Sequence, residues 1–117
     1  MPSEQRLITV VETQEFQARA ARRMADHERE AFIRYLAEHP EAGDLMPGTG
    51  GCRKVRWGYD AKGKRGGVRI IYYYHSAAMP IFVLTVFAKN ERSDLTPNER
   101  RILKQLASVL VKEYQGR

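Results

Sequence analysis

The sequence has a single cysteine, Cys52, and no long apolar run. One cysteine cannot form a disulfide within the chain, which is typical of proteins in a reducing compartment. The longest apolar run, 80–88, is far shorter than the ~20 residues of a membrane-spanning helix. The first residues also lack the cationic and apolar segments of a secretory signal. We therefore expect a cytoplasmic, unprocessed protein that does not interact with membranes.

The sequence also lacks the motifs of most metal, nucleotide and acyl-transfer sites. His27, His39 and His75 are scattered and show no ligand spacing. The glycine-rich segment 48–51 lacks the GxxxxGK[ST] pattern of a phosphate loop and precedes a predicted strand. There is no GxSxG motif for a serine nucleophile. We expect a protein without metal or cofactor.

The length of 117 residues and the 43% hydrophobic content fit one compact domain, which we assign to residues 1–117. Hydrophobic periodicity predicts a strand, two helices, three strands and a last helix. The strands are expected at 7–11, 52–57, 68–75 and 80–88, and the helices are expected to begin at the N-caps Thr13, Asp26 and Thr96. The order β-α-α-β-β-β-α, without a strand in the loop 43–51, indicates an α+β fold.

The last helix has the clearest local signals. Thr96 is its predicted N-cap, Pro97 its first residue and Glu99 the second half of a capping box. Its predicted buried face consists of five apolar residues: Ile102, Leu103, Leu106, Val109 and Leu110. The strand at 80–88 is apolar on both faces, so we expect it inside the sheet.

Positive charge is concentrated in one segment of the chain. The net charge of the whole sequence is +6, and residues 51–75 carry seven bases against the single acid Asp60. Such a patch attracts polyanions through long-range electrostatic steering. Nucleic acid is therefore a candidate ligand.

Strand alternation places several of these bases together. Side chains of a strand point to opposite faces in turn, so Lys54 and Arg56 share one face and Arg53 lies on the other. If the strands at 52–57 and 68–75 form a hairpin, Arg69 and Tyr73 join the face of Lys54. A face of convergent cations without matching acids indicates a polyanion-binding site. Tyr73 is either a stacking surface for a base or a core residue, whereas Tyr72 and Tyr74 are expected to pack under helices.

Three blocks of the sequence resemble a known family. They are GTGGCRKVRW from Gly48, KGKRGGVRIIYYY from Lys62 and FAKNERSDLT from Phe87. Together with the element order, they are similar to RelE-superfamily toxins of bacterial type II toxin–antitoxin systems. Within that superfamily they are most similar to the HigB branch, whose antitoxin carries a helix-turn-helix domain.

The resemblance implies a small microbial-ribonuclease-like fold, with a mostly antiparallel sheet and helices packed on one face. It implies metal-independent cleavage of messenger RNA in the ribosomal A site. It also implies that a helix-turn-helix antitoxin neutralises the toxin, and that operator DNA is bound only through this antitoxin. The catalytic residues implied by the family are Lys54, Arg56, Arg69 and Lys89. The expected RNA-binding residues are Arg53, Lys62, Lys64, Arg65, Tyr73, Asn90 and Arg92. Asn90 stands where other members place an arginine, and Thr96 stands near where some carry a catalytic tyrosine.

The chemistry leaves alternatives open. A lysine crowded by arginines can lose its proton near neutral pH, so Lys54 or Lys64 could act as a general base. Arginine stays protonated and serves as a clamp. Two other functions remain: a ParE-like inhibitor of DNA gyrase, which would share the fold, and a basic RNA-binding protein without activity.

Overall fold

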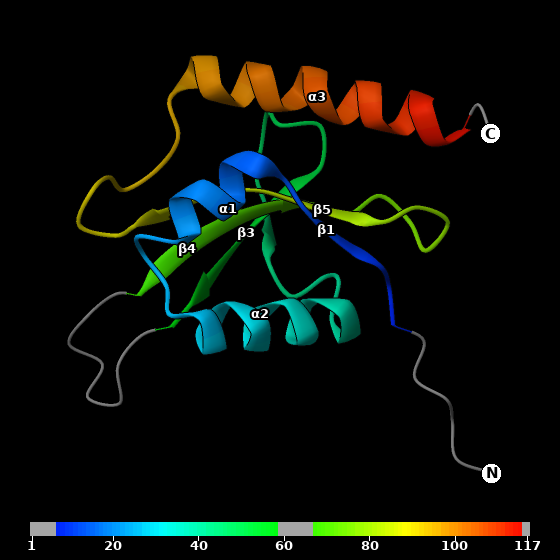
Figure 1. Ribbon diagram of the computed structural model, residues 1–117. Coiled ribbons are helices and arrows are strands. Elements are labelled where there is room, and N and C mark those ends of the chain that lie inside the picture. Colours follow the sequence, from blue (N-terminus) through cyan, green and yellow to red (C-terminus); the bar gives the residue numbers. More distant parts are fainter. Residues whose placement is uncertain (1–6, 59–66, 116–117) are drawn as a thin grey trace, which may run out of the picture.

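The computed structural model describes residues 7–58 and 67–115 as three helices and a five-stranded sheet (Figure 1). The strands are β1 (Val10–Glu12), β2 (Asp44–Leu45), β3 (Cys52–Trp57), β4 (Val68–Tyr73) and β5 (Ile81–Ala88). The helices are α1 (Gln14–Ala20), α2 (Asp26–Glu38) and α3 (Pro97–Gln115). The α+β fold class and the predicted order are confirmed, with one addition: β2 is a short strand within the segment that we expected to be a loop.

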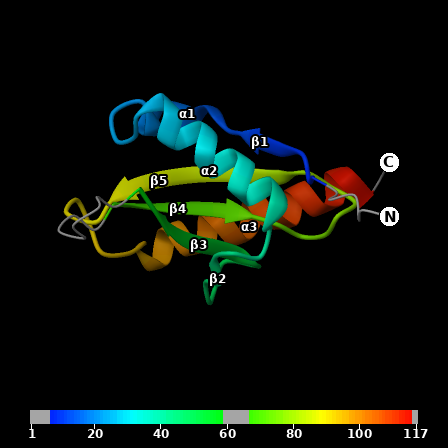
Figure 2. The same ribbon diagram turned by 90° about the horizontal axis from the view of Figure 1, so that it is seen from below.

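The sheet has the order β1-β5-β4-β3-β2, which is visible face-on in Figure 2. β1 runs parallel to β5, and the other three pairings are antiparallel. β5 is interior, as its apolar character on both faces predicted. β1 pairs only with residues 81–83 of β5. Next to this pairing, the side chain of Thr13 donates a hydrogen bond to the Val83 carbonyl of β5, and the side chain of Arg19 in α1 donates one to the Val86 carbonyl, both at 2.8 Å.

Helices cover both faces of the sheet, so the implied packing on one face holds only for α1 and α2 (Figure 1). On their side, Phe16 and Phe32 pack in one core with Tyr72. On the other side, Ala107 of α3 packs in a second core with Tyr73. The physical reason is that β4 and β5 are apolar on both faces, so each face needs a cover.

The helix ends agree only in part with the sequence signals. The capping box of α3 is confirmed: the Glu99 amide donates to the Thr96 hydroxyl at 3.1 Å, and the Thr96 amide donates to the Glu99 carboxylate at 2.8 Å. Thr13 caps α1 as predicted. α2 differs, because its N-cap is Ala25, whose amide donates to Glu28, and Asp26 is the first helical residue.

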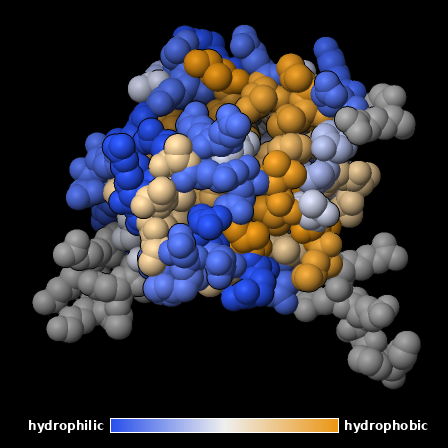
Figure 3. Space-filling view, viewed as in Figure 1, coloured by the Kyte–Doolittle hydropathy of each residue, from blue (hydrophilic) through white to orange (hydrophobic). Residues whose placement is uncertain are grey.

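The packed face of α3 is rotated from the predicted one. Leu103 and Leu110 contact the second core as predicted, together with Ala107, Val111 and Tyr114. Ile102, Leu106 and Val109 are instead exposed, and apolar surface is visible along α3 in the upper part of Figure 3. Apolar residues occupy more than half of this helix's circumference, so periodicity alone did not determine which of them face the sheet. Within the described ranges, none of the helices is long and apolar enough to cross a membrane.

Candidate active site

The pairing of β3 with β4 brings three cations to one face of the sheet. Arg56 lies directly opposite Arg69, and Lys54 lies opposite Ile71. Directly paired residues point to the same face, and Ile71 belongs to the core under α3. Lys54, Arg56 and Arg69 therefore share the α3 side of the sheet, as the alternation predicted. We call these three residues the cationic cluster.

The cluster holds like charges close together. Burial, and in second place the charge of Arg56, lowers the pKa of Arg69 from its ordinary value. Like charges directly opposite each other in a sheet are destabilising. Perturbed pKa values of this kind are frequent at sites that bind or transform an anion.

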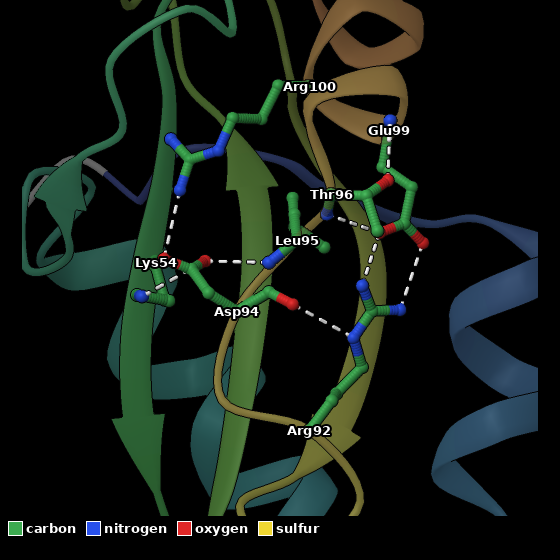
Figure 4. Close-up of polar contacts among 7 residues, drawn as sticks. All are labelled: Lys54, Arg92, Asp94, Leu95, Thr96, Glu99 and Arg100. Atoms are coloured by element: carbon green, nitrogen blue, oxygen red, sulfur yellow. Dashed lines mark hydrogen bonds and ion pairs between the residues drawn. The ribbon is translucent and has the colours of Figure 1, made fainter.

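Lys54 is in contact with the segment that leads into α3 (Figure 4). Its Nζ lies 3.4 Å from Oδ1 of Asp94. The other carboxylate oxygen, Oδ2, accepts a hydrogen bond from Arg100 of α3 at 2.9 Å. The Asp94 carboxylate thus joins β3 to the first turn of α3 and introduces a negative charge at the edge of the cationic cluster.

Arg92 is engaged in the same segment. Its guanidinium donates two hydrogen bonds to the carboxylate of Glu99 and one to the carbonyl of Asp94 (Figure 4). It also lies 5.5 Å from the ring centroid of Phe87. The hydrogen bond from Arg92, and after it the one from the Thr96 amide, lowers the pKa of Glu99 to about 2. Arg92 therefore anchors the start of α3. If Arg92 also contacts RNA, it does so with a guanidinium that already holds Glu99 and the Asp94 carbonyl.

The turn after β5 lies at the same end of the sheet as Arg56 and Arg69. Ala88 pairs with Val68 at the start of β4. Lys89 and Asn90 follow it and are exposed, and the Lys89 amide donates to the Gly67 carbonyl at 3.5 Å. Both residues are thus accessible to a ligand that reaches the cluster from this end.

Two of the expected RNA-binding residues are placed elsewhere. Arg53 points to the opposite face, where it donates to the Gly43 carbonyl at 2.8 Å and pairs with Glu41. Tyr73 is 3% exposed and packs in the core under α3, so its ring offers no free surface to a base. For Tyr73 the structure supports the core alternative. Lys62, Lys64 and Arg65 lie outside the described residues.

Other chemistry has little support among residues 7–58 and 67–115. No group of three or more His, Cys, Asp or Glu side chains there could hold a metal ion. Cys52 is buried, and burial raises its pKa to about 11, which keeps the thiol protonated. Thr96 caps α3 through its hydroxyl.

The sequence interpretation missed Asp94 and Arg100. The only signal was that Asp94 precedes the predicted capping box by two residues. That signal does not reveal a partner 40 positions away in β3. The contact depends on how α3 packs across the sheet.

Comparisons with known proteins agree with this architecture. Residues 8–116 match the family described as the RelE toxin of the RelE / RelB toxin–antitoxin system. The fold is similar to that of a free double arginine-to-alanine mutant of the Escherichia coli toxin RelE, with a TM-score of 0.54 and 16% sequence identity. That match covers 82% of this chain and 95% of the other. Because the family match spans nearly the whole sequence, this chain belongs to the RelE toxin family.

Proposed function

We propose that this toxin is an endoribonuclease that cleaves messenger RNA in the A site of the ribosome and thereby stops translation. The observation that carries the proposal is the cationic cluster, which groups Lys54, Arg56 and Arg69 on one sheet face. RelE-family toxins are generally endoribonucleases. A cluster of this kind suits a reaction in which negative charge increases on a phosphate.

RNA supplies its own nucleophile in the proposed reaction. The 2′-oxygen passes its proton to a general base or to water and attacks the adjacent phosphorus, and the bond to the 5′-oxygen breaks. The leaving 5′-oxygen takes up a proton, so the products are a 2′,3′-cyclic phosphate and a 5′-hydroxyl. Fixed cations beside the phosphorus stabilise the extra negative charge of the transition state.

The roles follow from position and chemistry. Arg69, on the interior strand β4, clamps the scissile phosphate, because a guanidinium stays charged and can donate two parallel hydrogen bonds. Arg56 and Lys54, on the neighbouring strand β3, supply further charge on the same face. Lys89 contacts a flanking phosphate from the turn after β5. The ribosome supplies the alignment of the message, which is worth several kcal/mol in such reactions.

A cognate antitoxin is implied by the family. We propose that it is a helix-turn-helix protein, as in the HigB-like branch, and that operator DNA is bound only through it. A helix-turn-helix reading frame adjacent to the gene of this toxin would support that assignment.

The first test is expression of the toxin without its antitoxin, followed by pulse labelling of protein, RNA and DNA. Protein synthesis should fall first. DNA supercoiling, measured separately on a plasmid, should stay normal. Early loss of supercoiling with translation intact would favour a gyrase inhibitor instead. Purified toxin should then cleave the message on programmed ribosomes. Binding without cleavage would indicate a non-catalytic RNA-binding protein.

A further inference from the structure

The carboxylate of Asp94 is an anion placed at a face that is otherwise suited to phosphate. Lys54 is 3.4 Å from its Oδ1. A phosphate oxygen of bound RNA would compete with this carboxylate for the same ammonium group.

Asp94 is held in place from several sides. Its Oδ1 accepts the Leu95 amide at 2.8 Å, and its Oδ2 accepts Arg100 at 2.9 Å. Arg100 is itself fixed, because it also donates to the Pro47 carbonyl at 2.8 Å. Arg92 donates to the Asp94 carbonyl at 3.0 Å. The carboxylate therefore has little freedom to move, and Lys54 is oriented toward a fixed point.

The charge of Asp94 is maintained at neutral pH. Burial alone would raise its pKa, but the Leu95 amide and then the charges of Lys54 and Arg100 bring the pKa below its ordinary value. The 3.4 Å contact therefore joins the Lys54 ammonium to a charged and fixed carboxylate.

We propose that Asp94 is a positioning residue that orients Lys54 for cleavage and, at the same time, weakens RNA binding by competing with phosphate for that lysine. The inference rests on the proposed endoribonuclease function and adds a residue to its site. It predicts two opposite effects of removing the charge: slower cleavage and tighter binding. A residue that only supports the fold would lower both activity and affinity.

The test compares Asp94→Asn with wild type in two assays. Asparagine keeps the shape and can still accept the Leu95 amide, but it lacks the charge. Cleavage is measured as the maximal single-turnover rate on programmed ribosomes, and it should fall on the order of tenfold because Lys54 is no longer aligned. Binding is measured by fluorescence anisotropy with a short single-stranded RNA that carries 2′-O-methyl groups and cannot be cleaved. Its Kd should fall roughly two- to threefold, since one repulsive charge is gone.

The salt dependence of binding gives an independent readout. In the wild type, a phosphate that pairs with Lys54 replaces the Asp94 carboxylate. In Asp94→Asn, it replaces a counterion instead. The slope of log K against log salt should therefore become steeper by up to ~0.7, the value for one further contact on a single strand. Glu38→Gln is the matched control, because it removes the same charge from the exposed end of α2 on the opposite face. It should change neither rate nor slope.

A double-mutant cycle tests whether Asp94 acts through Lys54. In a Lys54→Gln background, Asp94→Asn should have no further effect on the rate or the salt slope. Effects of full size in that background would overturn the proposal. So would a wild-type rate for Asp94→Asn, or a joint loss of rate, affinity and Tm.

A second variant keeps the proposal testable if Asp94→Asn folds poorly. Asp94→Glu keeps the charge but moves it by one methylene group, so it should lower the rate and leave the salt slope unchanged. A wild-type rate for this variant would overturn the proposal. Failure of the wild-type toxin to cleave ribosome-bound message would instead contradict the proposed function, and the binding assay does not depend on that outcome.

Discussion

Arg56 and Arg69 occupy directly opposed positions on β3 and β4, with their side chains on the same face of the sheet. Burial and the neighbouring Arg56 charge lower the pKa of Arg69 from its ordinary value, so the surroundings disfavour its charged form. Neither arginine belongs to the two hydrophobic cores of the sheet. The pair is thus the feature of the site whose removal separates activity from stability most directly.

We expect Arg69→Ala to lose nearly all cleavage activity while the fold stays intact. Loss of a charge-assisted clamp removes ~3 kcal/mol of transition-state stabilisation, on the order of a hundredfold in rate. Tm should stay close to the wild-type value, because the Arg69 side chain belongs to neither hydrophobic core. The measurement is single-turnover cleavage of ribosome-bound message together with thermal unfolding. A wild-type rate would remove Arg69 from the site.

Two substitutions distinguish whether Lys54 supplies positive charge or acts as a general base. Lys54→Ala should lower the rate about a hundredfold. Because the Lys54 ammonium faces the Asp94 carboxylate, and a guanidinium can make the same contact, Lys54→Arg should retain the rate to within about tenfold. Equal losses in both variants would show that Lys54 transfers a proton, since arginine cannot accept one near neutral pH.

The ion pair between Arg92 and Glu99 should make the start of α3 sensitive to acid. The pKa of Glu99 falls from its ordinary 4.5 to about 2 in the folded chain. A lowered carboxylate pKa stabilises the fold fully above pH 4.5, and this stabilisation is lost as the pH falls to about 2.

Glu99→Gln should accordingly be less stable than wild type at pH 7 by less than about 1 kcal/mol, because the pair is partly exposed to solvent. The difference should shrink between pH 4.5 and 2. Thermal unfolding across this range measures it. Glu113→Gln, on an exposed position of the same helix, is the control and should show no such dependence.

Tyr72 is predicted to matter for stability and not for chemistry. Its ring is fully buried, and its hydroxyl accepts the Gly43 amide and donates to the Pro40 carbonyl, both at 2.8 Å. Tyr72→Phe leaves a buried amide without this partner and should cost about 1–3 kcal/mol. Tyr72→Ala also creates a cavity and should cost about 3–5 kcal/mol. Urea unfolding measures both. Loss of cleavage by a still-folded Tyr72→Phe would contradict this assignment.

The parts of the fold that sequence predicted best are governed by local rules. The bounds of β3 and the cap at Thr96 follow from alternation and from capping chemistry, which need only a few neighbouring residues. The shared face of Lys54 and Arg69 also followed, because a hairpin register preserves alternation.

The parts that sequence did not predict depend on tertiary packing. The contact of Lys54 with Asp94 needs α3 to lie across the second face of the sheet, which the implied one-sided packing did not include. The exposure of Ile102 has the same origin, since several faces of α3 are apolar enough to be buried. Arg53 was counted with its charged neighbours although alternation already placed it on the opposite face.

The alternation of core and charged residues along β4 restricts how this gene can change. Arg69 lies between Val68 and Ile70, which pack in the core under α1 and α2. Deletion or insertion of one codon within the strand would turn the arginine into that core and an isoleucine toward the face of the cationic cluster. Natural length variants of this toxin should therefore keep the codon spacing of β4 intact, whereas substitutions that preserve the alternation can accumulate.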